Sequence, residues 1–138
     1  MLIHLDFESP VPIYVQLRNE IVRGIGQGEL QYGESLPTVR QLAQEIGINA
    51  MTVSKAYGIL KEEGFLVIDR RHGAKVVPLP DGHLEFSHRQ EQELERFITE
   101  AAARGIGEED FLAQCQKIYE KLAKGSGQSL SKGQEEVL

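Results

Sequence analysis

The stretch from Leu36 to Leu60, LPTVRQLAQEIGINAMTVSKAYGIL, contains a single acidic residue, Glu45. From Asn49 onward its polar side chains are neutral or basic. Amide, hydroxyl and ammonium groups can bind phosphate oxygens and base edges, whereas a carboxylate would be repelled by a nearby phosphate. The chemistry that these residues suit is therefore contact with DNA.

The overall charge of the chain argues in the opposite direction. The 138 residues carry 21 Asp and Glu against 15 Lys and Arg, a net charge of −6, which taken alone disfavours nucleic acid. The excess is uneven, because residues 1–80 have a net charge of −1 (eight basic, nine acidic) and residues 81–138 of −5 (seven basic, twelve acidic). Acidic residues are thus missing locally, from the segment whose chemistry suits DNA.

The candidate DNA-contacting residues stand at the starts of two predicted helices and in a predicted turn. A helix start presents free backbone N–H groups that attract phosphate. The candidates are Thr38 and Arg40 at the first helix, Asn49, Ala50, Thr52, Ser54 and Lys55 at the second, and Arg70, Arg71 and His72 in the turn. Each has an alternative interpretation, since Thr38 and Asn49 would cap their helices without DNA and the others could be ordinary solvated residues.

Two short amphipathic helices must position these side chains. Thr38 and Gln41 have the spacing of a capping box, Gly47 stands where a left-handed helix end is expected, and Asn49 can cap the next helix. The predicted buried faces are Val39, Leu42, Ala43 and Ile46 on the first helix, and Val53, Ala56, Tyr57 and Leu60 on the second. So short a connection predicts a helix-turn-helix.

The flanking segments complete a winged form of this motif. A helix follows Pro12, with Ile13, Tyr14, Leu17, Ile21 and Ile25 on its buried face. After Gly64, the segments FLVI and KVVPL predict a β-hairpin with Gly73 near its tip. The alternating segment LIHLDF at residues 2–7 predicts a short strand. The alternative of an arbitrary pair of helices is disfavoured by the hairpin that follows directly.

Two further helices are predicted beyond a linker at residues 78–83. Ser87 and Gln90 form a second capping-box pattern, and a later helix begins with Glu108, Glu109 and Asp110, where the helix dipole favours acids. Two helices alone cannot enclose a core, so their apolar faces should pack between two copies of the chain or, alternatively, on their own winged domain. The predicted dimerisation residues are Leu94, Phe97, Ile98, Ala101, Phe111, Cys115, Ile118, Tyr119 and Leu122.

The sequence therefore predicts an α+β fold in three parts. Residues 1–80 would form a winged helix-turn-helix domain for DNA binding, residues 81–124 a helical hairpin for dimerisation, and residues 125–138 a disordered tail. The hairpin leaves little room for an enclosed ligand pocket, although a small-molecule effector could bind at the dimer interface or between domains.

Several classes of function are excluded by what is missing. No apolar run approaches the ~18 residues that a membrane span needs, and the first ten residues do not resemble a signal peptide. The single cysteine, Cys115, permits no internal disulfide and fits the cytoplasm. The histidines at 4, 72, 83 and 88 lack metal-ligand spacing and no catalytic motif is present, so we expect no enzyme, metal or cofactor.

The segment GESLPTVRQLAQEIGINAMTVSKAYGILKEEGFL, followed by RRHGAKVV, resembles the GntR family of bacterial transcription regulators over about residues 11–78. PIYVQL, NAMTVSKAY and the short C-terminal extension are most similar to its YtrA-like subfamily. The resemblance implies that Arg40, Asn49, Thr52 and Lys55 contact DNA and that His72 and Gly73 form the tip of the wing. Two residues depart from the family pattern: Ala50 replaces a frequent Arg or Pro, and Ala74 replaces a wing glycine.

From the residues and the resemblance together, we expect a sequence-specific transcription regulator. It would be a homodimeric repressor that binds double-stranded DNA at an inverted repeat. The alternative is a winged-helix module that binds protein and not DNA, which the acidic total favours slightly and the acid-free segment disfavours.

Overall fold

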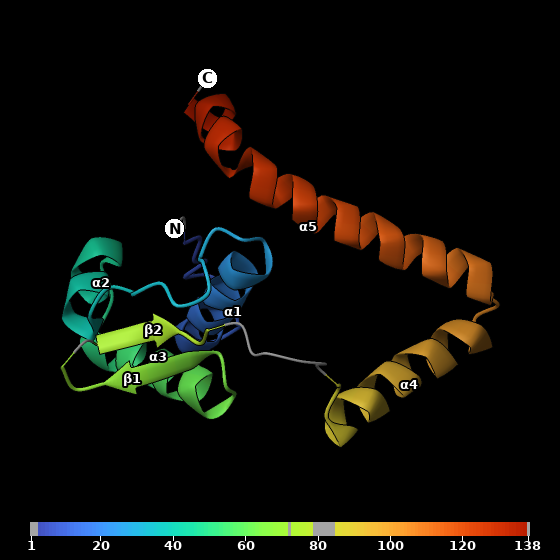
Figure 1. Cartoon of the computed structure of the whole chain (residues 1–138), viewed down its shortest axis with the longest axis horizontal. Helices are drawn as coiled ribbons and strands as arrows, with labels where there is room; N and C mark the ends of the chain where they lie inside the picture. The colour runs from blue at the N-terminus through green and yellow to red at the C-terminus, as the bar shows by residue number, and fades with distance from the viewer. Residues whose placement is uncertain (1–2, 72, 79–84, 138) are drawn as a thin grey trace.

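The structure, a computed structural model, describes residues 3–71, 73–78 and 85–137, and only the backbone of residues 125–137. Its described part contains helices α1 (Ile13–Gly26), α2 (Val39–Ile46) and α3 (Ala50–Glu62), strands β1 (Leu66–Asp69) and β2 (Gly73–Val76), and helices α4 (His88–Ala103) and α5 (Glu108–Val137). As Figure 1 shows, the first three helices and the hairpin cluster together, α4 lies away from them, and α5 runs from the far end of α4 back towards the cluster. The predicted α+β fold, a winged helix-turn-helix followed by a helical part, is confirmed.

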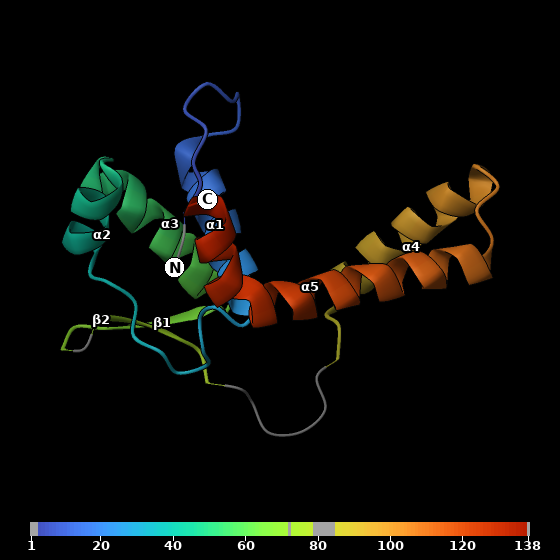
Figure 2. The same ribbon diagram turned by 90° about the horizontal axis from the view of Figure 1, so that it is seen from above.

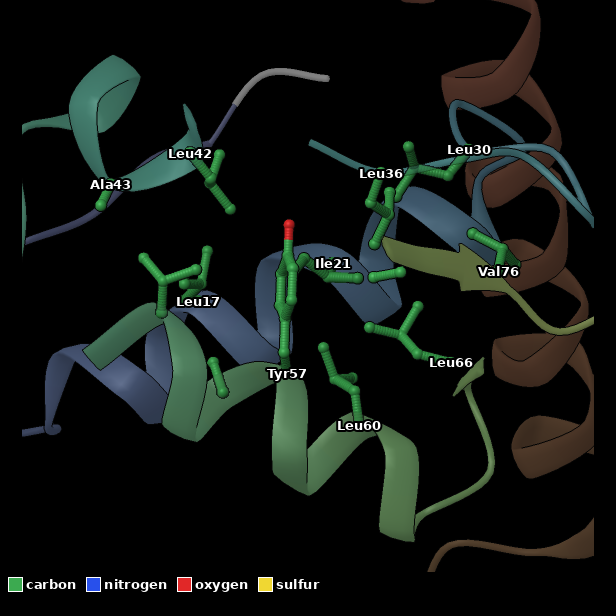
Figure 3. Close-up of a cluster of buried hydrophobic side chains, with 13 residues drawn as sticks. Leu17, Ile21, Leu30, Leu36, Leu42, Ala43, Tyr57, Leu60, Leu66 and Val76 are labelled. Atoms are coloured by element: carbon green, nitrogen blue, oxygen red, sulfur yellow. The ribbon is translucent and has the colours of Figure 1, made fainter. Parts of the chain in front are cut away.

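Apolar faces of α1, α2, α3 and the hairpin meet in one core. The predicted stripes supply its centre, because Leu17, Ile21, Val53, Ala56 and Leu60 are completely buried. Tyr57 stands among them, with its ring between residues of α1, α2 and the hairpin (Figure 3). Each large apolar side chain that is fully buried contributes about 1.5–3 kcal/mol relative to exposure, so this core fixes the relative positions of α2 and α3.

The helix ends follow their capping signals. Thr38 Oγ1 accepts from the Gln41 backbone N–H at 3.1 Å, and the Gln41 side chain accepts from Thr38 in return. Asn49 Oδ1 accepts from the Met51 backbone N–H at 2.8 Å. Gly47 lies in the left-handed region with φ of 70°, which an L side chain adopts only at a cost. The predicted capping box, glycine end and asparagine cap are therefore confirmed.

The wing is a two-stranded antiparallel hairpin in which Leu66 pairs with Val76 and Asp69 with Gly73. The loop before α2 adds a further contact, since Ser35 forms a bridge with Lys75 and the Leu36 N–H donates to the Ala74 carbonyl at 2.8 Å. These bonds attach the wing to the start of α2.

The strand predicted for residues 2–7 is wrong over the described residues 3–7, which form no strand. The backbone there bonds to side chains of α1 instead of to a neighbouring strand. The His4 N–H donates to Glu20 Oε2 at 3.0 Å, and the Asp6 N–H donates to Gln16 Oε1 at 2.7 Å. The alternation of apolar and polar residues was real, but no sheet edge lies beside it.

The C-terminal helices meet only near their connection. Ser87 and Gln90 form the predicted capping box at the start of α4, and the rings of Phe97 and Phe111 pack edge to face with centroids 6.2 Å apart. Beyond this contact α4 and α5 diverge (Figure 1), and large apolar side chains of both helices remain exposed within one chain. The expectation that these faces need a partner surface beyond the two helices stays a prediction.

Two further predictions concern segments around these helices. The backbone of α5 is helical as far as Val137, and the disordered tail predicted for residues 125–138 stays a prediction. A helix closes its hydrogen bonds within itself, and residues 125–138 contain no proline that would interrupt it. Apart from Pro78, the linker predicted at 78–83 lies outside the described residues. The division into three parts stays a prediction.

Candidate nucleic-acid interface

The candidate residues of α2, α3 and the wing lie on elements that share one end of the domain. Figures 1 and 2 both place α2, the start of α3 and the turn between β1 and β2 at this end. The buried core fixes the two helices, and the Tyr57 hydroxyl of α3 donates to the carbonyl of Pro37, in the segment just before α2, at 2.8 Å. The start of α3 is therefore held by packing from behind and presents its other face outward.

At the start of α2, Thr38 and Arg40 have different roles. Thr38 is exposed, but its hydroxyl and backbone N–H both bond to Gln41 in the capping box. Arg40 is exposed, and within the described residues it forms no ion pair. The guanidinium of Arg40 is thus available to an external anion, whereas Thr38 acts first as a helix cap.

The start of α3 carries no carboxylate. Asn49, Ala50, Ser54 and Lys55 are exposed, and Thr52 is half-buried. Asn49 uses its side-chain oxygen to cap the helix, which leaves its NH₂ group to donate outward. This face therefore offers amide, hydroxyl and ammonium groups to a ligand.

Lys55 is oriented by an aromatic ring of α1. Its Nζ lies 3.9 Å from the centroid of the Tyr14 ring, a cation–π contact. Such contacts are worth about 0.5–1 kcal/mol at exposed sites, enough to favour one position of a flexible side chain. Tyr14 was predicted only to lie on the buried face of α1, and it is half-buried there.

The wing turn contributes two exposed arginines. Asp69 Oδ1 accepts from the Arg71 backbone N–H at 2.9 Å, which fixes the turn, and both Arg70 and Arg71 are exposed. Gly73 begins β2 with φ of 73°, in the left-handed region that glycine tolerates. His72 lies outside the described residues.

The face of α3 that packs against the core carries one ionisable side chain, Tyr57. Burial raises the pKa of its hydroxyl to about 12, and the negative charge of Glu45 adds to the effect. Tyr57 is therefore neutral at physiological pH and acts as a hydrogen-bond donor, not as a chemical group at the surface.

Met51 also belongs to this surface, although it is not among the residues predicted to contact DNA. It is the second residue of α3, and its side chain is 79% exposed. Its spacing from Ser54 and Lys55, three and four residues on, places all three on one face and could have revealed it.

The described residues contain no group of three or more His, Cys, Asp or Glu side chains that could hold a metal ion. None of the helices in the described residues is long and apolar enough to cross a membrane.

The matched segment and the fold together decide the family. The model of the bacterial regulatory proteins of the gntR family matches residues 13–76, from the first residue of α1 to the last of β2. YtrA from Sulfolobus acidocaldarius, a GntR-family transcription factor, is 32% identical, with 86% of this chain and 97% of that chain covered and a TM-score of 0.55. The chain belongs to the GntR family.

Curated relatives of this GntR chain are transcriptional regulators. HTH-type transcriptional regulator Rv1152 of Mycobacterium tuberculosis is 35% identical over 71 residues, 51% of this chain and 59% of that protein. HTH-type transcriptional repressor YtrA of Bacillus subtilis is 37% identical over 75 residues, 54% of this chain and 58% of that protein. The chain thus spans less than two thirds of either relative. The predicted YtrA-like type is confirmed, and this family consists of regulators and not of enzymes, as expected.

Proposed function

We propose that this GntR regulator binds double-stranded DNA sequence-specifically and represses transcription as a homodimer on an inverted repeat. Membership of the family supports DNA binding, and the names of the relatives support a role in transcription. The name of YtrA of Bacillus subtilis, a transcriptional repressor, favours repression over activation.

One observation carries the proposal: the exposed start of α3 presents amide, hydroxyl and ammonium groups and no carboxylate. The acidic residues of α3, Glu62 and its neighbour Glu63 at the helix cap, lie at the opposite end. A recognition helix enters the major groove with its N-terminal residues facing the base edges, so this distribution of charge is what close approach to phosphate requires.

The remaining candidates would position the helix. Arg40, at the start of α2, would contact a phosphate beside the groove, and Arg70 and Arg71 on the wing would contact the adjacent backbone. Thr38 would contribute through the N–H groups that its cap orders. Base readout would come from Asn49, Thr52, Ser54 and Lys55, with Ala50 allowing close approach, and His72 and Gly73 would form the tip of the wing.

The dimer is supported by apolar side chains that one chain leaves uncovered. Phe97 is 65% exposed, Ile118 51% and Tyr119 73%, and Leu94 and Ile98 are also exposed. Large apolar side chains left exposed along both helices favour association with another surface. A second copy that packs against these faces would also draw on Phe111, Cys115 and Leu122, which are half-buried, and on the buried Ala101. A two-fold dimer presents two recognition helices, and therefore favours an inverted repeat.

The experiment that tests DNA binding is a fluorescence-anisotropy titration with DNA from upstream of the protein's own gene, at several salt concentrations. Specific binding with Kd of about 10⁻⁸ M or tighter is expected. Arg40→Ala should weaken binding. It should also reduce the slope of log affinity against log salt concentration by about 1 for each arginine removed. Arg89→Ala is the matched control, because Arg89 is exposed on α4 and paired with Glu93 at 3.2 Å.

The alternative is a winged-helix module that binds a protein. It predicts no preference for any duplex over random DNA and no difference between Arg40→Ala and Arg89→Ala.

A further inference from the structure

Met51 has the greatest exposed fraction, 79%, of the large apolar side chains in the described part of the chain. It stands on α3, the helix that the proposed function places in the major groove. Its backbone N–H bonds to the Asn49 cap, but its side chain takes no part in the core. The fold therefore gives no reason for a large apolar group at this position.

Met51 lies on the side of α3 that faces away from the core. The inward face of α3 consists of Val53, Ala56, Tyr57 and Leu60. At 100° per residue Met51 lies opposite this face, with Ser54 and Lys55 one turn further on. Because helical side chains tilt towards the N-terminus, Met51 also covers the end of the helix that would enter the groove first.

The neighbours of Met51 are polar, so its chemistry stands out from theirs. Asn49, Ser54 and Lys55 can hydrogen-bond to phosphates and base edges, which a thioether chain does poorly. The major groove offers one kind of apolar group, the 5-methyl of thymine, and apolar side chains recognise thymine by contact with it. Methionine is unbranched and flexible, and it adapts its shape to such a group.

We propose that Met51 is a specificity-determining residue that selects thymine by contact with its 5-methyl group in the major groove. This inference rests on the proposed DNA-binding function and assigns part of its sequence preference to one side chain. Burial of a single methyl group against Met51 corresponds to about a fourfold gain in affinity for each half-site.

The test begins with duplexes that the full-length protein enriches from a random-sequence pool. In the enriched duplex each thymine of a half-site is replaced in turn by uracil, which lacks only the methyl group. Binding of the wild-type protein, Met51→Ala and Met51→Leu is then measured by anisotropy. Because Met51 is exposed and alanine favours helix, Met51→Ala should fold, and its thermal unfolding is compared with that of the wild type.

The inference predicts one thymine per half-site at which uracil weakens wild-type binding about fourfold. Met51→Ala should bind the thymine and uracil duplexes equally, and Met51→Leu should keep part of the preference. Uracil tolerated at every position, or the same loss in Met51→Ala as in the wild type, would overturn the inference. Failure to enrich any duplex would instead refute the proposed DNA binding, so the two failures are distinguishable.

Discussion

Tyr57 ties α3 to the segment that leads into α2 through one hydroxyl group, which donates to the Pro37 carbonyl at 2.8 Å while its ring fills the core. Tyr57→Phe keeps the ring and removes the bond, and it leaves a carbonyl without its partner. We expect a loss of about 1 kcal/mol in the free energy of unfolding at pH 7, measured by urea denaturation. An unchanged stability would mean that water replaces the hydroxyl without cost.

The same residue should make stability depend on alkaline pH. Burial raises the pKa of Tyr57 to about 12 in the folded state, above the ordinary value of 10.0. The stability that neutral Tyr57 contributes is therefore fully present below pH 10. It is lost as the pH rises towards 12, because this tyrosine loses its proton at a lower pH in the unfolded chain than in the folded chain. Urea denaturation between pH 9 and 12 should show a steeper fall for the wild type than for Tyr57→Phe. Parallel curves would contradict the assignment.

The contact between Lys55 and Tyr14 predicts an effect on DNA affinity from a residue that is half-buried on α1. Tyr14→Phe keeps an aromatic ring beneath the ammonium group and should bind as the wild type does. Tyr14→Leu removes the ring, and affinity should fall about twofold to fivefold, as expected for the loss of an exposed cation–π contact. Anisotropy titrations measure both variants, and equal affinities for the two would refute an orienting role for the ring.

Two glycines of the helix-turn-helix should respond to alanine in opposite directions. At Gly47, φ is 70° and no atom lies within 4 Å of an added Cβ, so Gly47→Ala should cost about 1 kcal/mol through backbone strain alone. At Gly58, within α3, the space is equally open and the conformation is helical, so Gly58→Ala should stabilise by about 1 kcal/mol. Thermal unfolding compares the pair, and shifts of the same sign would contradict this account.

The features that the sequence predicted best are helix ends, whose signals lie in neighbouring residues. Some helix ends are specified by bonds or conformations within a few residues. The examples here are Thr38 with Gln41, Ser87 with Gln90, and Gly47, and all three appear in the structure. The strand at residues 2–7 failed because a strand needs a neighbouring edge, which no local pattern can guarantee. Neighbouring residues were therefore sufficient to predict the helix caps and insufficient to predict the pairing of strands.

The parts of the site that the sequence missed depend on distant residues. Tyr14 and Lys55 are 41 positions apart, and only the packing of α1 on α3 brings them together. Away from the site, the ion pair between Arg18 of α1 and Glu63 at the end of α3, 2.9 Å long, also joins distant residues, and the hydrogen bond from Arg18 lowers the pKa of the Glu63 carboxyl. Such contacts follow from tertiary structure, whereas the acid-free face of α3 could be predicted from residue types alone.

At the scale of the whole molecule, the proposed dimer predicts that a charge on the apolar faces will separate the subunits. A double variant with Phe97→Glu and Ile118→Glu alters two exposed side chains, so the winged domain should fold unchanged. Analytical ultracentrifugation should show a dimer for the wild type and a monomer for the variant. Val67→Glu is the control, because Val67 is 49% exposed on β1, outside those faces, and should remain dimeric.

A dimer of the double variant would favour another interface, and a monomeric wild type would remove the basis for a paired site. In either case the exposed faces of α4 and α5 would require another explanation.

Sequence-specific binding by a dimer is tested most directly by sequencing the duplexes that the full-length protein enriches from a random pool. A homodimeric regulator should enrich one short motif in two inverted copies, with centres about 10–10.5 base pairs apart or a multiple of this. That result would establish sequence-specific binding and two-fold symmetry together. An enriched pool without any common motif, or with the motif in single copies only, would contradict the account.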